Sequence, residues 1–322
     1  MIARFHYSDE SKNAQTPHEN LINHYQTSED DSFAMTTATD KINDTSSTAT
    51  STHGTEKSIV VTGFGPFGGV EDNPTTVIVR RLDSYLRSSS GAIVADMVKD
   101  YIVLETSAKS VNETMDVLRT ECADAAALAA VNASNDIGRT VPRWLLLHLG
   151  VARSKGFRLE SCAYNEATFR IPDQRGYQPT RETIVSNPTD EVGQCYETSL
   201  DLEGLKKSME RDFPNISTVV STNPGRFVCN YVYCKSLEVA MKYSARKESL
   251  KSGVGDSTQP STSDTITGSF NEKGGTKNGE NASTNFICES LFLHVPHFAI
   301  VPEEEQLAYV AALIKNLAAQ DK

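Results

Sequence analysis

The stretch Arg143-Trp-Leu-Leu-Leu-His-Leu-Gly150 is a short, nearly continuous apolar run that ends in a glycine. Because its apolar residues do not alternate with polar ones, both faces of the segment are expected to be buried, as in a central strand of a parallel sheet. His148 lies inside this run, so it is expected to be structural or to line a pocket rather than to act in catalysis. The run therefore predicts a sheet with helices on both of its faces.

Strand and helix patterns alternate on either side of this run. Further strands are expected at 57–64, 92–95, 101–104, 217–221 and 286–295, with an extended segment at 157–169. Helices are expected at 74–87, 107–132, 200–212, 228–246 and 302–319. This alternation indicates a mostly parallel sheet, and such sheets form sites at the carboxyl ends of their strands. We predict an α/β protein with a single three-layer α/β/α domain around a mixed, mostly parallel central sheet.

Two stretches differ in composition from the rest of the chain. Residues 1–55 are rich in Ser, Thr, Asp, Asn and His, and residues from about 247 to 285 are rich in Ser, Gly, Thr and Asn. Neither stretch can bury enough apolar surface to offset the entropy lost on ordering. We expect a disordered tail at 1–55 and one domain over 56–322, interrupted by a low-complexity surface insertion at about 247–285.

Charge and cysteine content narrow the classes of partner. The 322 residues carry a net charge of −11, which disfavours nucleic acid and anionic membranes. No apolar run approaches the ~20 residues that span a bilayer, and the first residues lack the apolar core of a signal peptide. The six scattered cysteines are typical of free thiols in a reducing compartment. We expect a cytoplasmic protein without nucleic-acid or membrane partners, and the sequence leaves open whether it forms a homo-oligomer.

A glycine-rich loop, Gly63-Phe-Gly-Pro-Phe-Gly68, follows the first predicted strand. It matches the dinucleotide pattern G-x-G-x-x-G, but there the third glycine lies in a helix, whereas here a helix cannot begin before Asn73-Pro74. Pro66 also removes an N–H group that a phosphate would need. Phe64 and Phe67 suit a small, flat, apolar ligand better than a nucleotide. A purely structural turn stays open as the alternative.

Three residues far apart in the sequence offer the groups of a cysteine hydrolase. Cys229 follows a glycine-containing turn at a predicted helix start, where the helix dipole favours a thiolate. His294 ends an apolar run and would take the thiol proton, while Glu160 would hold the imidazole in one tautomer. Each also has a structural alternative, namely a buried small hydrophobe, a core histidine and a solvated strand residue. Cys234, on the same predicted helix, is expected to be a core residue.

Other polar residues near these three allow further interpretations. His297 follows His294 closely, and Cys288 precedes it, so a metal site is an alternative interpretation of these residues. However, the histidines are not on a helix and no H-E-x-x-H pattern is present, so no metal is expected. Arg170, in Arg170-Ile-Pro-Asp173, would stabilise an oxyanion or would lie on the surface, and the sequence does not favour either.

Three segments together resemble the pyroglutamyl peptidase I family, which are cysteine peptidases that remove an N-terminal pyroglutamate. They are Thr62–Gly69 with Asn73-Pro74, Gly150–Asp173 with its Glu160-Ser-Cys-Ala-Tyr-Asn165 and Arg170-Ile-Pro-Asp173 motifs, and Gly225–Tyr233 followed by Phe292–Pro296. The joint agreement in order and context is far more specific than any one motif.

The resemblance implies roles for individual residues. Cys229 matches the nucleophile, His294 its base and Glu160 the third member of the triad. Phe64 and Phe67 match the aromatic residues that line the pyroglutamyl pocket, and Phe227 lies beside the nucleophile. With Arg170, these residues form the predicted site.

The resemblance also implies the reaction. The expected function is hydrolysis of the amide bond after an N-terminal 5-oxoproline in small peptides, without a cofactor. Two alternatives stay open, namely an amidase for another small lactam or acyl group, and a weakly active or inactive homologue that binds blocked peptide N-termini. Asn223-Pro224 departs from the Asp-Ala common in the family, and Arg153 and Lys155 lie where the family has small or polar residues. These departures concern pocket shape and efficiency more than reaction type.

Overall fold

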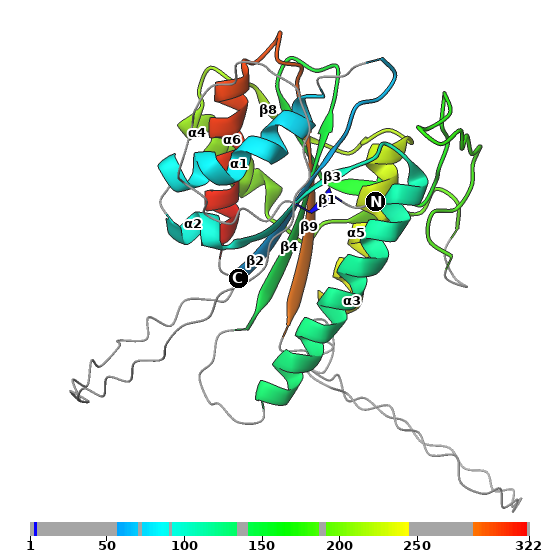
Figure 1. Cartoon of the computed structure of the whole chain (residues 1–322), viewed down its shortest axis with the longest axis horizontal. Helices are drawn as coiled ribbons and strands as arrows, with labels where there is room; N and C mark the ends of the chain where they lie inside the picture. The colour runs from blue at the N-terminus through cyan, green and yellow to red at the C-terminus, as the bar shows by residue number, and fades with distance from the viewer. Residues whose placement is uncertain are drawn as a thin grey trace, which may run out of the picture. The chain divides into compact units, whose positions relative to one another are not determined.

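The computed structural model describes residues 3–4, 57–69, 73–89, 92–133, 141–186, 191–244 and 286–320 (Figure 1). The chain divides into two compact units, Met1–His6 with Gly54–Lys322 and Tyr7–His53, and the described residues belong to the first. The predicted insertion, and the predicted tail except for Ala3–Arg4, lie outside the described residues. Within the described ranges no helix has the length and apolar character needed to cross a membrane.

The described elements follow the alternation that the sequence predicts. The strands are β1 (Ala3–Arg4), β2 (Lys57–Phe64), β3 (Val98–Leu104), β4 (Arg143–Val151), β5 (Phe157–Glu160), β6 (Cys162–Tyr164), β7 (Cys195–Glu197), β8 (Thr218–Ser221) and β9 (Ile287–Val295). The helices are α1 (Pro74–Ser89), α2 (Ala92–Asp96), α3 (Ala108–Ala133), α4 (Leu202–Asp212), α5 (Val228–Ser244) and α6 (Glu303–Ala319).

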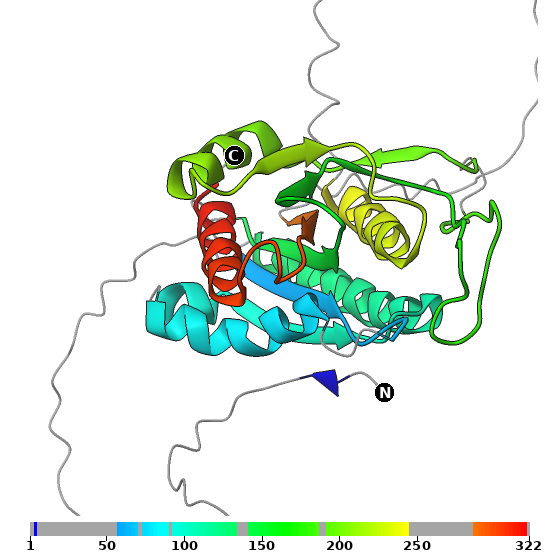
Figure 2. The ribbon, with the colours of Figure 1, turned by 90° about the horizontal axis from the view of Figure 1, so that it is seen from above.

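The central sheet has the strand order β1-β3-β2-β4-β9-β5-β8, and β6 pairs with β7 separately. Strands β3, β2, β4 and β9 are parallel, whereas β5 runs antiparallel to β9 and β8 is parallel to β5. Figure 2 shows the sheet between two helical layers, with α1, α2, α4 and α6 on one side and α3 and α5 on the other. The predicted three-layer architecture with a mixed, mostly parallel sheet is confirmed.

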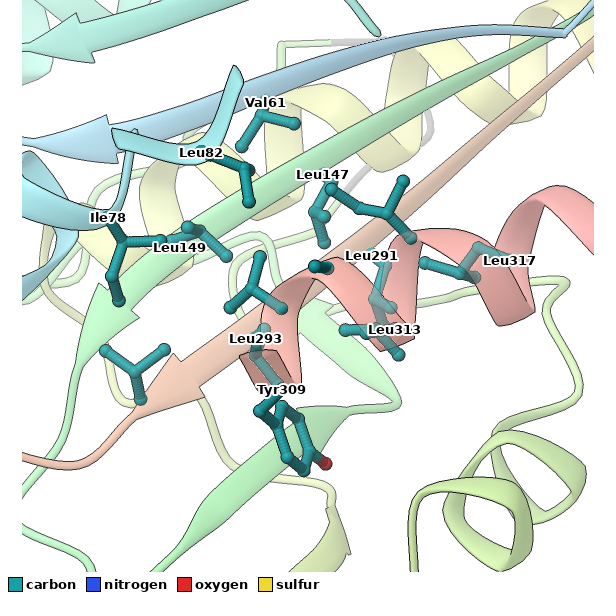
Figure 3. Close-up of a cluster of buried hydrophobic side chains, with 14 of the residues drawn as sticks. Val61, Ile78, Leu82, Leu147, Leu149, Leu291, Leu293, Tyr309, Leu313 and Leu317 are labelled. Carbon is teal, nitrogen blue, oxygen red and sulfur yellow. The ribbon is translucent and has the colours of Figure 1, made fainter. Parts of the chain in front are cut away.

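Each face of the sheet has its own hydrophobic core. On one face, Leu147 of β4 and Leu291 of β9 pack with residues of α1 and α6 (Figure 3). On the other face, Trp144 and Leu146 of β4 pack with residues of α3 and α5. The buried apolar run of β4 thus contributes to both cores, as its lack of alternation predicts.

Two local predictions were wrong. The segment 92–95 was predicted as a strand but belongs to the short helix α2, where Ile93 is 76% exposed. Its apolar residues therefore do not form a buried pleated surface, and strand β3 begins only at Val98. The segment 157–169 is not one extended piece but two short strands, β5 and β6, in different sheets.

The direction of β5 changes how the site is built. The carboxyl-end rule places Gly150 and His294 at the same edge, near the ends of β4 and β9. Strand β5 runs the opposite way, so Glu160 lies opposite Phe292 rather than at that edge. The Glu160 side chain therefore reaches His294 from a position inside the sheet and not from the edge at which the parallel strands end.

Candidate active site

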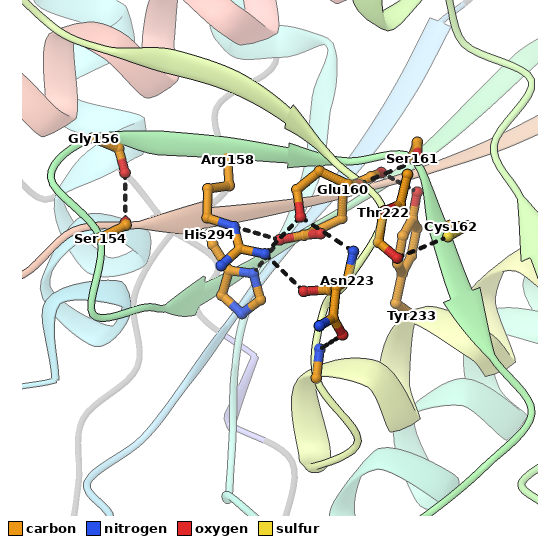
Figure 4. A network of polar contacts seen from close by, with 12 residues as sticks. Ser154, Gly156, Arg158, Glu160, Ser161, Cys162, Thr222, Asn223, Tyr233 and His294 are labelled. Carbon is orange, nitrogen blue, oxygen red and sulfur yellow. Dashed lines mark hydrogen bonds and ion pairs between the residues drawn. The ribbon is translucent and has the colours of Figure 1, made fainter.

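Glu160 and His294 form a buried acid–base pair on two neighbouring strands. His294 Nδ1 lies 2.7 Å from Glu160 Oε1 (Figure 4). The Glu160 side chain is fully buried and that of His294 is 7% exposed. A carboxylate on Nδ1 favours the tautomer with a proton there, which leaves the lone pair on Nε2. The two residues are therefore in direct contact, which is a geometry that a base and its orienting group require.

Cys229 is the second residue of α5, as the sequence predicted. The turn before it contains Gly225 at φ 84°, a left-handed conformation that favours glycine. The Sγ atom lies close to Gly150, where an added Cβ would be 3.0 Å from Sγ and 2.6 Å from the Phe292 ring. Gly150 is the direct β-partner of His294. The absence of a side chain at residue 150 therefore lets the thiol approach the strand that carries His294.

Two polar side chains of α5 hold the Cys229 helix against the Glu160 segment through three hydrogen bonds. Asn230 exchanges hydrogen bonds with the backbone of Tyr164, with Oδ1 accepting from N and Nδ2 donating to O, both at 2.8 Å. Tyr233 donates its hydroxyl to the Glu160 carbonyl at 2.7 Å. No hydrogen bond joins Cys229 to His294, although both are described residues. Catalytic hydrogen bonds are often long before substrate binds, so this separation is compatible with a nucleophile and its base.

The thiol of Cys229 is a weak acid in this environment. Burial and, to a smaller extent, the negative charge of Glu160 raise its pKa to about 12, against the opposing effect of the residue's own backbone N–H. The helix-start argument from the sequence is therefore outweighed by desolvation. At neutral pH the thiol is protonated, so it needs a base to become a nucleophile.

The first turn of α5 provides hydrogen-bond donors next to the thiol. Tyr231 N donates to Phe227 O at 3.0 Å. The N–H groups of Val228, Cys229 and Asn230 therefore precede the first residue that has an intrahelical acceptor. Such donors are suited to an oxyanion that forms on a carbonyl attacked by Sγ.

Aromatic rings gather beside the same turn. Phe67 and Phe227 have ring centroids 5.4 Å apart, and Phe169 packs against Phe227 at 4.7 Å. Phe67 is half-buried, but Phe64 is only 4% exposed and belongs to the core beneath α3 and α5. The structure thus brings Phe67 and Phe227 together as a partly open aromatic pair and makes Phe64 part of the packing below.

Several other described residues that the sequence singled out form no hydrogen bond or ion pair with Glu160 or His294. Arg170 is exposed. Asp173 accepts a hydrogen bond from Ala108 N at the start of α3, which is a structural role. His148 is fully buried, its Nδ1 is 2.8 Å from Thr62 Oγ1, and burial lowers its pKa to about 3. Among the described residues no cluster of three or more His, Cys, Asp or Glu is placed to hold a metal ion.

Sequence reasoning missed Arg158. Its Nε lies 3.1 Å from Glu160 Oε1, the same oxygen that contacts His294. The signal was available, because residues two apart on a strand share a face. It could be used only after the 157–160 segment was known to be a strand paired with β9.

Comparisons with known proteins agree with this arrangement. The chain matches the family described as pyroglutamyl peptidase over residues 57–253. It is 25% identical over 178 residues to a pyrrolidone-carboxylate peptidase of Vibrio campbellii, covering 55% of this chain and 69% of that protein. It is 27% identical over 182 residues to the corresponding protein of Thermococcus litoralis, covering 56% and 68%.

A solved structure supports the fold. Pyrrolidone carboxyl peptidase from Pyrococcus furiosus aligns with a TM-score of 0.51 and 22% identity, covering 81% of this chain and 97% of that one. The family match ends before β9, so the position of His294 rests on the geometry. The match nevertheless covers more than half of the chain, and the sequence-based expectation of the family is confirmed: the chain belongs to the pyroglutamyl peptidase family.

Proposed function

We propose that this protein hydrolyses the amide bond that follows an N-terminal 5-oxoproline in peptides, with Cys229, His294 and Glu160 as its catalytic residues. The observation that carries this proposal is the buried His294–Glu160 pair beside a cysteine at a helix start, in a chain of this family. The family and its relatives do not favour an amidase for other groups or an inactive binding homologue.

The reaction begins with proton transfer from Cys229 Sγ to His294 Nε2 as sulfur attacks the pyroglutamyl carbonyl. Glu160 stabilises the resulting imidazolium through Nδ1. The N–H groups at the start of α5 receive the developing oxyanion. His294 then gives its proton to the leaving amine, which departs and leaves a thioester. Water, deprotonated by His294, hydrolyses the thioester and restores the thiol.

Specificity for the lactam is supported by the Phe67–Phe227 pair. The pyroglutamyl ring is small, flat and uncharged, so aromatic rings enclose it without leaving a charge unpaired. An N-terminal Glu or Gln carries an ammonium group, and burying that charge without a partner costs several kcal/mol, or roughly a hundredfold or more in binding. We therefore expect glutamyl and glutaminyl substrates to be rejected.

The decisive experiment measures release of the fluorophore from a pyroglutamyl-coumarin amide. The wild type should turn over this substrate, and Cys229→Ala should abolish turnover while retaining the folded state. Cys195→Ala is the matched control, because Cys195 is exposed and lies on β7 rather than on the helix that begins at the proposed nucleophile. Absence of wild-type turnover, or full activity in Cys229→Ala, would exclude the proposal.

A pH series tests the role of His294. In the wild type, iodoacetamide should label Cys229 near neutral pH, because His294 accepts the thiol proton. In His294→Ala, labelling should be slow at pH 7 and should rise with pH, because burial raises the pKa of the Cys229 thiol and no imidazole accepts its proton. Equal labelling rates in the two proteins would remove His294 from the mechanism.

The aromatic pair is tested by two substitutions with different expected results. Phe67→Ala should lower kcat/KM by roughly 10- to 1000-fold, because ring contact with the substrate is lost. Phe64→Ala should instead lower the free energy of unfolding by about 3–5 kcal/mol, because Phe64 is a core residue. If Phe67→Ala turns over the substrate normally, the loop is only a structural turn.

We further propose a cytoplasmic location, which is supported by the free state of all six cysteines. Size-exclusion chromatography will distinguish a homo-oligomer from a monomer.

A further inference from the structure

Arg158 is the charged residue nearest to the acid–base pair that the proposed mechanism leaves without a role. It lies on β5 two residues before Glu160, and its direct β-partner on β9 is His294. Because side chains alternate along a strand, Arg158, Glu160 and His294 all lie on one face of the sheet. The guanidinium group is therefore held beside the imidazole and the carboxylate at once.

Three contacts fix the Arg158 side chain (Figure 4). Its Nε lies 3.1 Å from Glu160 Oε1, and one Nη donates to Ser221 Oγ at 2.5 Å and to Asn223 O at 2.7 Å. Its side chain is 29% exposed, so the group is mostly withdrawn from water. An arginine held in this way connects the end of β5 to the segment that follows β8.

That segment leads directly to the nucleophile. Asn223 N donates to Ser221 Oγ at 3.2 Å, and Gly225 N donates to Asn223 Oδ1 at 3.2 Å. Gly225 is the left-handed residue of the turn that begins the Cys229 helix. A continuous set of polar contacts, first an ion pair and then hydrogen bonds, therefore runs from the Glu160 carboxylate through Arg158 to the turn before Cys229.

We propose that Arg158 is a positioning residue, which holds the Glu160 carboxylate on His294 and couples it to the turn that places Cys229. The inference rests on the proposed function. Glu160 Oε1 contacts both Arg158 Nε and His294 Nδ1. The other carboxylate oxygen, Oε2, is buried and receives no hydrogen bond from the described residues. Without Arg158, only the bond to His294 fixes the rotation of the carboxylate, and the orientation of the imidazole becomes less defined.

The primary test is Arg158→Ala, compared with Arg81→Ala. Arg81 is the matched control, since it pairs with Glu303 and Glu304 on the opposite helical layer and is 45% exposed. We expect Arg158→Ala to lower kcat by roughly 10- to 100-fold, as expected for a misplaced catalytic group, with KM within about threefold. Arg81→Ala should change neither.

A double-mutant cycle separates positioning from general structural support. If Arg158 acts through Glu160, then Arg158→Ala should cost less than about threefold further in the Glu160→Gln background. Additive losses in the two variants would overturn the proposal. So would a loss confined to KM, which would instead make Arg158 a residue that binds the leaving peptide.

Rescue experiments cover the case in which Arg158→Ala folds poorly. Arg158→Lys keeps the charge but lacks the fork that joins Glu160, Ser221 and Asn223, so its kcat should fall between wild type and alanine. Added guanidinium ion should restore part of the activity of the alanine variant at concentrations that do not unfold it. Wild-type kcat in Arg158→Lys together with no rescue of the alanine variant would overturn the bridging role.

Measuring the rate of Cys229 alkylation by iodoacetamide tests the role of Arg158 without any assumption about the substrate. It depends on the same His294–Glu160 pair, and it should slow in Arg158→Ala even if pyroglutamyl amides are not the substrate. A wild type that alkylates rapidly but does not turn over pyroglutamyl-coumarin would contradict the proposed function alone. An unchanged alkylation rate in Arg158→Ala would contradict the positioning role.

Discussion

Two buried pairs of polar side chains lie near opposite ends of β9, one shared with β4 and the other with β5, and the two pairs differ in how completely they are bonded. At the amino end, Arg143 pairs with Glu289 and also donates to Gln320 O, with the two side chains 8% and 7% exposed. At the carboxyl end, Glu160 pairs with His294 and leaves Oε2 without a hydrogen bond from the described residues. Strand β9 thus takes part in a closed polar cluster near one end and an open one near the other.

The amino-end cluster stabilises the end of a helix. Lys57 Nζ donates to Gln320 O at 3.1 Å and also to Ala318 O, so two cations meet the last carbonyl groups of α6. Positive charge at a helix C-terminus is favourable, and it satisfies carbonyl groups that have no partner within the helix. In the proposed mechanism, the proton of Cys229 moves to Nε2 of the histidine in the carboxyl-end pair. The difference teaches that a saturated buried pair serves folding, whereas an incompletely bonded one serves chemistry.

The largest effect is expected when the amino-end pair is broken. Arg143→Ala should lower the free energy of unfolding by about 3–5 kcal/mol, because it leaves the buried Glu289 carboxylate without its main partner. The activity of the protein that remains folded should not change. Urea denaturation and active-site titration measure the two quantities. A stable Arg143→Ala variant with reduced kcat would reverse the assignment of the two ends.

Glu160→Gln should have the opposite profile. We expect kcat to fall by roughly 10- to 1000-fold, or about 1.4–4 kcal/mol in activation free energy, with unfolding changed by only about 1 kcal/mol. Gln keeps the shape but cannot stabilise an imidazolium. Loss of its negative charge should also lower the pKa of the Cys229 thiol. If the variant is fully active, Glu160 belongs to the structural class.

His148 lies on β4 between the two ends. We expect its replacement to have a smaller effect, which depends on pH. Burial lowers its pKa to about 3, so its neutral form is favoured in the folded state. Its contribution to stability is complete above the unfolded pKa of about 6.5, and it is lost as pH falls toward 3, at about 1.4 kcal/mol per pH unit. His148→Gln removes this titration. Urea midpoints at pH 7.5 and 4.5 should therefore lie closer together in the variant, and equal spacing would refute the assignment.

The smallest effect is expected when the predicted tail or the predicted insertion, which belong to neither pair, is removed or shortened. Removing residues 1–55, or replacing about 250–283 with a short Gly/Ser linker, should keep thermal stability and turnover within a few-fold. Their low apolar content motivates this prediction, and loop-closure entropy changes by only about 0.6 kcal/mol per doubling of length. A collapse of activity after the insertion is shortened would show that it shapes the site.

Local patterns predicted the elements whose signal lies within a few residues. The apolar run of β4, the helix start at Cys229 and the strand that ends near His294 were all located from such signals. The segment 92–95 failed because its apolar residues carry no information on whether a neighbouring strand is available. The sequence did not predict the direction of β5 for the same reason, since the pairing of β5 with β9 is decided by residues more than a hundred positions away.

The sequence by itself determined the three layers and the family, and it singled out the cysteine, the histidine and the carboxylate that we propose as catalytic residues. Only the tertiary structure decided which atoms meet. The bond between Glu160 and His294 joins residues 134 positions apart, and the approach of Cys229 to Gly150 depends on how α5 crosses β4. Arg158 acquires its contacts only because β5 runs antiparallel to β9. The pKa of Cys229 likewise follows from burial, which the packing of the whole domain creates and which no local pattern reports.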